Sequence, residues 1–71
     1  MAPHLALTLA AVVDEGTLDG AARRLHLTPS AVSQRIKTLE EHLGQRLLVR
    51  SRPARPTAAG EAVVRFARRY A

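Results

Sequence analysis

The sequence predicts a small, mainly α-helical domain with one short β-hairpin, and three observations support this fold class. The chain has 71 residues, which is enough for one hydrophobic core but not for two. Apolar residues recur at helical spacing in four segments, and residues typical of helix starts and ends bound these segments. After Gly44 the helical spacing stops, and a short apolar run followed by prolines indicates two strands and a turn.

The first predicted helix begins at Pro3 and ends near Gly16, because proline suits the first turn of a helix and glycine suits its end. Its apolar residues do not form a single stripe. They form two faces, with Leu5, Leu9 and Val12 on one side and Leu7 and Ala11 on another. We therefore expect this helix to contact two structures at once, one of them outside the compact fold.

A second, short helix is expected from Thr17, its N-cap, to about Leu25. Asp19 lies in its first turn, where the helix dipole favours a negative charge. One face of this helix is apolar and contains small residues that allow close helix packing: Leu18, Ala21, Ala22 and Leu25.

The third helix has the strongest start signal in the chain, with Thr28 as N-cap and Pro29 at the first helical position. Gly44 is its expected C-cap. Only two residues separate it from the second helix, so the two must cross sharply rather than run antiparallel. Its buried arc is expected to consist of Val32, Ile36, Leu39 and Leu43.

A hairpin and a last helix complete the chain. We expect a strand over residues 47–49, a turn over 51–56 and a short return strand before Thr57. Thr57 is the expected N-cap of a final helix that runs to Ala71. Its apolar stripe is Ala59, Ala62, Val63, Phe66, Ala67 and Tyr70.

The charge is strongly positive and unevenly distributed. The net charge is +5, and all eleven cations, ten of them Arg, follow residue 22. This favours a polyanionic partner, first nucleic acid and second an acidic membrane, over a merely solubilising coat. The chain has no cysteine, which excludes disulfides and Cys-containing zinc fingers, and it has no signal peptide or membrane-spanning run, so we expect a cytoplasmic protein.

Two helices joined by a tight turn, the second capped and polar at its start, are typical of a helix-turn-helix that enters the major groove of DNA. Pro29, Ser30 and Ser33 are short enough to approach base edges, and Gln34 can make a bidentate contact with adenine. Thr28 can bond a phosphate at the helix N-terminus. Alternatively, this polar arc is only the solvated side of an amphipathic helix.

The hairpin carries a cluster of positive charge, because Arg46, Arg50, Arg52 and Arg55 occur within ten residues that contain no acid. Such a cluster repels itself unless an anion binds. A helix-turn-helix followed by a cationic hairpin is a winged helix-turn-helix, whose wing contacts the sugar-phosphate backbone or the minor groove. Alternatively, Arg46 and Arg50 only flank a strand and extend into solvent.

The chain resembles the N-terminal domain of the LysR-type transcriptional regulators over nearly its whole length. The residues that carry this resemblance are Gly16-Thr17-Leu18, the run from Ala21 to Lys37, Leu39-Glu40, Leu43-Gly44, Leu47-Leu48, Arg50 and Thr57-Ala58-Ala59-Gly60. Within the family, the string from Thr28 to Lys37, together with Gly44-Gln45 and the segment from Leu48 to Pro53, looks most like the branch that regulates export of lysine and arginine.

The resemblance implies sequence-specific binding of double-stranded DNA, with bases read by Pro29, Ser30, Ser33 and Gln34. Many relatives have Arg where Gln34 stands, so a different operator is expected here. The contacts to the DNA backbone are expected from Thr28, Arg35, Lys37, Thr38, Arg50, Arg52 and Arg55.

The resemblance also implies a homodimer on an inverted-repeat operator. Residues 1–56 would form the winged domain and residues 57–71 the dimerisation helix, through Ala59, Ala62, Val63, Phe66, Ala67 and Tyr70. Members of the family normally continue into an effector domain, whereas this sequence ends at Ala71, so we expect this chain to bind no small-molecule effector and no cofactor.

Other functions have weaker support. His4, His26 and His42 lack metal-ligand spacing, and no serine is accompanied by a His and an acid in a catalytic pattern, so no enzyme is expected. One alternative is a protein-interaction module that dimerises through the last helix and binds nucleic acid non-specifically. Another is a membrane-surface peptide, because Arg65, Arg68 and Arg69 accompany an apolar stripe.

Overall fold

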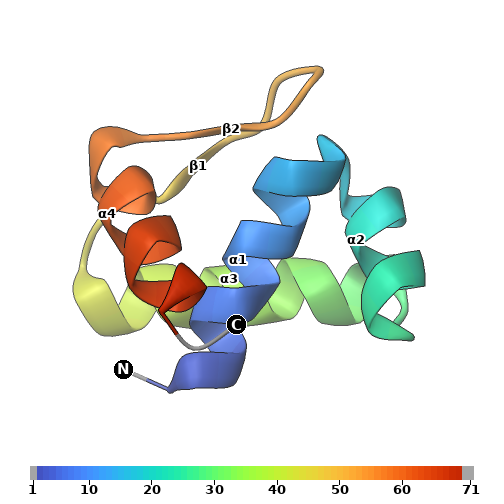
Figure 1. Cartoon of the computed structure of the whole chain (residues 1–71), viewed down its shortest axis with the longest axis horizontal. Coiled ribbons are helices and arrows are strands. Elements are labelled where there is room, and N and C mark those ends of the chain that lie inside the picture. The colour runs from blue at the N-terminus through green and yellow to red at the C-terminus, as the bar shows by residue number, and fades with distance from the viewer. Residues whose placement is uncertain (1, 70–71) are drawn as a thin grey trace.

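The computed structural model describes residues 2–69 and contains four helices and a two-stranded antiparallel sheet within them (Figure 1). This agrees with the mainly helical fold predicted from the sequence. The elements in chain order are α1 (Pro3–Glu15), α2 (Leu18–Leu25), α3 (Pro29–Leu43), β1 (Leu48–Val49), β2 (Arg55–Pro56) and α4 (Ala58–Arg68).

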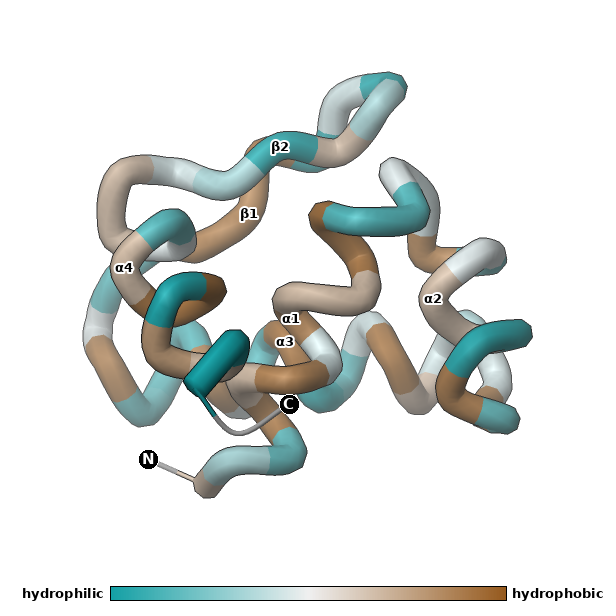
Figure 2. Tube along the Cα trace, viewed as in Figure 1, coloured by the Kyte–Doolittle hydropathy of each residue, from teal (hydrophilic) through white to brown (hydrophobic). Residues whose placement is uncertain are grey.

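The centre of the molecule is α1, which packs against α2, α3 and α4 (Figure 1). Leu9 and Val12 are fully buried, and Ala11 on the second apolar face is also buried. The expectation that one face of this helix meets something outside the compact fold is therefore wrong for Ala11. The physical reason is that α4 folds back onto α1 and closes the core of the same chain. Figure 2 accordingly shows much of α1 as a hydrophobic stretch at the middle of the molecule.

The caps confirm the predicted starts of the second, third and fourth helices and the predicted end of the third. The hydroxyl oxygens of Thr17, Thr28 and Thr57 accept hydrogen bonds from the backbone N–H groups of Gly20, Ala31 and Gly60, at 2.9, 3.1 and 3.0 Å. Gly44 ends α3 in the left-handed conformation, with φ 64°. Each of these signals acts within one helical turn, and so they are readable from the sequence.

The buried face of α3 consists of Val32, Ile36 and Leu39, as predicted. Leu43, which was predicted to belong to this face, is 37% exposed. It lies in the last turn of α3, and the core near the hairpin is filled instead by Leu47 and Leu48. The opposite face of α3 is polar, and Ser30, Gln34 and Lys37 on it are exposed.

The hairpin is shorter than predicted, because β1 begins at Leu48 rather than at residue 47. Leu48 pairs with Pro56 and Val49 with Arg55. Near the base of the hairpin, the Glu40 carboxylate accepts a hydrogen bond from the Leu47 backbone N–H at 2.8 Å. Toward its tip, the Ala54 N–H donates to the Gly16 carbonyl oxygen, also at 2.8 Å. The hairpin is therefore fixed to α3 on one side and to the α1–α2 connection on the other.

The last helix, α4, contributes Val63, Val64 and Ala67 to the core of this chain. The prediction placed Val63 and Ala67 on a stripe facing a second protomer and omitted Val64. The helix ends at Arg68 with Arg69 as its C-cap, and residues 70–71 of the predicted helix lie outside the described residues. The proposed division of the chain at residue 56 stays a prediction.

Candidate nucleic-acid interface

The exposed start of α3 brings the four predicted base-reading residues onto two consecutive helical turns. Pro29, Ser30 and Gln34 are exposed, and Ser33 is half-buried. The Thr28 hydroxyl oxygen caps the helix through Ala31 N–H, and its own hydroxyl proton remains available to a phosphate oxygen. This end of the helix thus exposes small or polar side chains to solvent.

Farther along α3, the predicted backbone-contacting residues differ in exposure. Lys37 is exposed, whereas Arg35 and Thr38 are half-buried. The Gln34 side-chain nitrogen Nε2 donates to Thr38 Oγ1 at 3.4 Å. Thr38 is therefore engaged with a neighbouring side chain on its own helix, which the sequence interpretation did not include.

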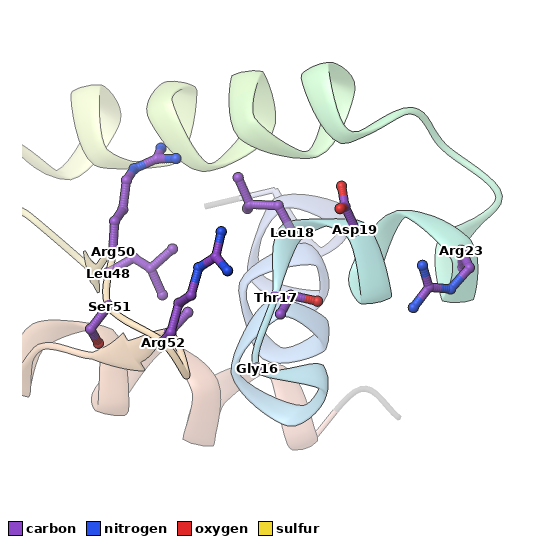
Figure 3. A pocket seen from close by; sticks show the side chains of 10 residues that line it. Gly16, Thr17, Leu18, Asp19, Arg23, Leu48, Arg50, Ser51 and Arg52 are labelled. Atoms are coloured by element: carbon purple, nitrogen blue, oxygen red, sulfur yellow. The ribbon is translucent and has the colours of Figure 1, made fainter.

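A side chain from the hairpin reaches the polar arc of α3. Arg50, directly after β1, donates from Nη2 to the Ser33 hydroxyl oxygen at 3.5 Å. In Figure 3 the Arg50 side chain extends from the hairpin toward α3. The contact brings a predicted wing residue and a predicted base-reading residue together, and it leaves the Ser33 hydroxyl proton available for donation.

The four clustered arginines of the hairpin region do not share one environment. Arg46 forms an ion pair with Glu40, with 3.7 Å between Nε and Oε2. Arg52 and Arg55 are exposed, and within residues 2–69 neither has an acidic group within ion-pair distance. The unpaired positive charge therefore lies toward the tip and return strand of the hairpin, which is the part that an anion can approach.

A cleft of about 590 Å³ opens between the hairpin and the start of α2 (Figure 3). Its lining is positive on balance, because it includes three arginines and one acid, Asp19. The lining residues that matter here are Thr17, Leu18, Arg23, Leu48, Arg50 and Arg52. The sequence interpretation named neither Thr17 nor Arg23 as a site residue, although the positive charge at the end of the second helix was readable from the sequence.

The acidic side chains near the end of α1 form ion pairs with arginines of α2 and α4. Asp14 forms ion pairs with Arg68 of α4 at 2.9 Å and with Arg24 of α2 at 3.3 Å. The hydrogen bond from Arg68 and that from Arg24 hold the pKa of the Asp14 carboxyl below its usual value, although partial burial acts in the opposite direction. This carboxylate therefore joins three helices and does not neutralise the hairpin.

The predicted dimerisation residues of α4 divide into two groups. Val63 and Ala67 are buried in the core of this chain. Ala62 is exposed, and Ala59 and Phe66 are half-buried. Tyr70 lies outside the described residues.

The helix pair α2–α3, the caps and the cationic hairpin together define a winged helix-turn-helix, the class to which this domain belongs. A family model described as "Bacterial regulatory helix-turn-helix protein, lysR family" matches residues 4–61. The chain belongs to this family. Within residues 2–69, no helix combines the length and the apolar character that a membrane crossing requires.

Similar proteins include the HTH-type transcriptional regulator LysG of Mycobacterium tuberculosis. It is 60% identical over 65 residues, which are 92% of this chain and 21% of that protein. The lysine export transcriptional regulatory protein LysG of Corynebacterium glutamicum is 50% identical over 62 residues, or 87% of this chain and 21% of that protein. The chain thus spans about one fifth of the length of these relatives.

Solved structures of regulators have the same fold. The full-length LysG of Corynebacterium glutamicum with bound effector Arg superimposes with a TM-score of 0.95 and 47% identity, over 99% of this chain and 24% of that one. A complex of the CbnR DBD with DNA superimposes with a TM-score of 0.89 and 37% identity, over 99% of this chain and 82% of that one.

Proposed function

We propose that this chain binds double-stranded DNA sequence-specifically as the DNA-binding part of a LysR-type regulator. The observation that carries the proposal is the contact between Arg50 and Ser33, which places the hairpin beside the exposed polar start of α3. An α-helix fits the major groove, and a cationic hairpin at its side meets the phosphates next to that groove. A solvated helix face alone would not need an arginine-rich hairpin fixed beside it.

The roles follow from the chemistry of each side chain. Pro29, Ser30 and Ser33 allow close approach to base edges, and Gln34 can donate to N7 and accept from N6 of adenine. The contacts to phosphates are assigned to Thr28, Arg35, Lys37, Arg50, Arg52 and Arg55. Arg23 and Thr17 join this set, because they line the cleft into which Arg50 and Arg52 extend.

Homodimerisation through α4 is part of the proposal, with a narrower surface than the apolar stripe suggests. Of the predicted dimerisation residues that the structure describes, Ala59, Ala62 and Phe66 keep surface with which to meet a second protomer, whereas Val63 and Ala67 are buried in the core. Two recognition helices must lie about 34 Å or a multiple of it apart to enter successive major grooves. The expected operator is therefore an inverted repeat.

We propose that the regulated process is export of basic amino acids and that the regulator itself acts in the cytoplasm of a bacterium. It is supported by the relatives named for lysine export and by the LysG structure with bound Arg. We assign no effector site to residues 2–69.

A selection of bound sites from random duplexes tests this function. We expect enrichment of an inverted repeat, and we expect S33A and Q34A to lose preference at particular base pairs. Arg65→Ala serves as a control. It removes one positive charge, as a wing mutation does, but the charge it removes lies at an exposed position on α4. Recovery of sequences no different from the starting pool would favour the protein-interaction module and contradict the proposal. Enrichment of single half-sites would retain base reading and overturn the dimer.

A further inference from the structure

The side-chain amide of Gln34 contacts another residue of its own helix. Its Nε2 donates to Thr38 Oγ1, one helical turn farther on, at 3.4 Å. Residues four apart in an α-helix lie on the same face, so the two side chains meet without any distortion of the backbone. Within residues 2–69 this is the one hydrogen bond of the Gln34 side chain.

This contact leaves Gln34 able to read adenine. The amide nitrogen has two N–H groups, and only one of them bonds to Thr38. The second N–H and the carbonyl oxygen remain, and these are the donor and the acceptor that match N7 and N6 of adenine. Because all of these atoms lie in one amide plane, holding one N–H restricts the orientations that the other two groups can adopt.

Thr38 is suited to hold the amide. Its branched side chain is stiff in a helix, and it is half-buried, whereas Gln34 is exposed and has three rotatable side-chain bonds. Rotamer freedom that is already restricted in the free protein does not have to be lost on binding.

We propose that Thr38 is a positioning residue that orients Gln34 and thereby sharpens its preference for adenine, in place of a direct contact to the DNA backbone. This inference rests on the proposed base-reading role of Gln34. The two roles make different predictions, because a phosphate contact affects all sequences alike, whereas an orienting contact acts only through Gln34.

The test measures binding of the 71-residue chain to four duplexes that differ at a single base pair. This base pair is the one at which the sites selected by the unmodified chain and by Q34A differ most. The quantity compared is the ratio of the affinity for adenine to that for the other bases. Thr38→Val removes the hydroxyl and keeps the volume, whereas Thr38→Ser keeps the hydroxyl. Both variants are also made in the Q34A background, and thermal melting of every variant identifies any loss of folding.

We expect T38V to lower this ratio by about threefold, the worth of a modest hydrogen bond, and T38S to restore most of it. In the Q34A background, adding T38V should leave the ratio unchanged. T38V alone should bind an unrelated duplex with the same affinity as the unmodified chain. A ratio unaltered by T38V, an equal effect with and without Gln34, or an equal weakening of all four duplexes would each overturn the orienting role. If Q34A itself changes no base preference, the reading role of Gln34 fails, and the role of Thr38 fails with it.

Discussion

Gly60, in the first turn of α4, lies so close to the backbone carbonyl oxygen of Leu47 that no side-chain carbon fits between them. The same carbonyl oxygen accepts a hydrogen bond from the Thr57 N–H at 3.1 Å. The start of α4 is therefore docked directly on the base of the hairpin. This close approach therefore helps to set the position of the wing relative to the proposed dimerisation helix.

Gly60→Ala is expected to destabilise the chain by about 2 kcal/mol or more, because the Leu47 backbone must move to admit the methyl group. Helix propensity alone predicts the opposite sign, a gain of about 1 kcal/mol. Chemical denaturation measures the free energy of unfolding. The matched control is G44A, where an added carbon meets open space but φ is 64°, so a loss of only about 1 kcal/mol is expected. A G60A variant as stable as the unmodified chain would contradict the close approach.

Thr57→Val should cost about 1 to 2 kcal/mol of unfolding free energy. The Thr57 hydroxyl accepts from Gly60 N–H and also donates to the Arg46 carbonyl oxygen at 2.6 Å, so it joins α4 to the residues before β1. T28V is the comparison, because the Thr28 hydroxyl makes only the cap bond among the described residues. Thermal melting of both variants should show the larger loss for T57V, and equal losses would show that the second bond contributes nothing.

The ion pairs of Asp14 predict a stability that depends on pH. The folded-state pKa of this carboxyl is lowered below 3.8, chiefly by its hydrogen bond from Arg68, so the charged form stabilises the fold. That contribution is fully present above the unfolded-state pKa and is lost as pH falls through the lower folded-state value. D14N should therefore lower stability by less than about 1 kcal/mol at neutral pH. The difference from the unmodified chain should shrink below about pH 4.

Melting temperatures at several pH values between neutrality and strong acid check this expectation. Glu41→Gln alters an exposed carboxylate that has no ion pair within residues 2–69, and it is the matched control. If the stability difference between D14N and the unmodified chain grows toward low pH, the pH dependence has the opposite sign to the one expected, and the expectation is wrong.

Arg52→Ala and Arg55→Ala should each weaken binding to all duplexes about equally and reduce the slope of log K against log salt by about one. Both side chains are exposed at the hairpin without an acidic partner among the described residues, so each is free to displace a counterion. Fluorescence anisotropy over a series of salt concentrations gives the slope. R65A should leave the slope unchanged. Loss of preference at single base pairs in R52A would mean that this arginine reads bases instead.

The parts of the fold that were predictable depend on local signals. The N-cap bonds of Thr17, Thr28 and Thr57 and the termination at Gly44 each involve residues within one turn, and the apolar period of α3 identifies its buried face apart from Leu43. The arginine-rich hairpin was readable for the same reason, since its charges and prolines lie within eleven residues.

The parts that were not predictable depend on which segments meet in space. An apolar stripe on α4 does not say whether it faces α1 or a second protomer, and the structure assigns Val63 and Ala67 to the chain's own core. The contact between Arg50 and Ser33 joins residues 17 positions apart, and the pairing of Arg68 with Asp14 joins residues 54 apart. Such contacts follow from the assembled fold, not from spacing.

The central claim is that the polar start of α3 meets DNA bases, and the side-chain amide signals in an NMR spectrum test it most directly. Gln34 and Gln45 carry the only side-chain amides in the chain, so the spectrum contains its own control. With a selected duplex, we expect the Gln34 signals to shift and those of Gln45, beyond the end of α3, to stay in place. A scrambled duplex of the same length should shift Gln34 much less. Saturated binding that leaves Gln34 unmoved, or that moves it equally with both duplexes, would contradict the claim.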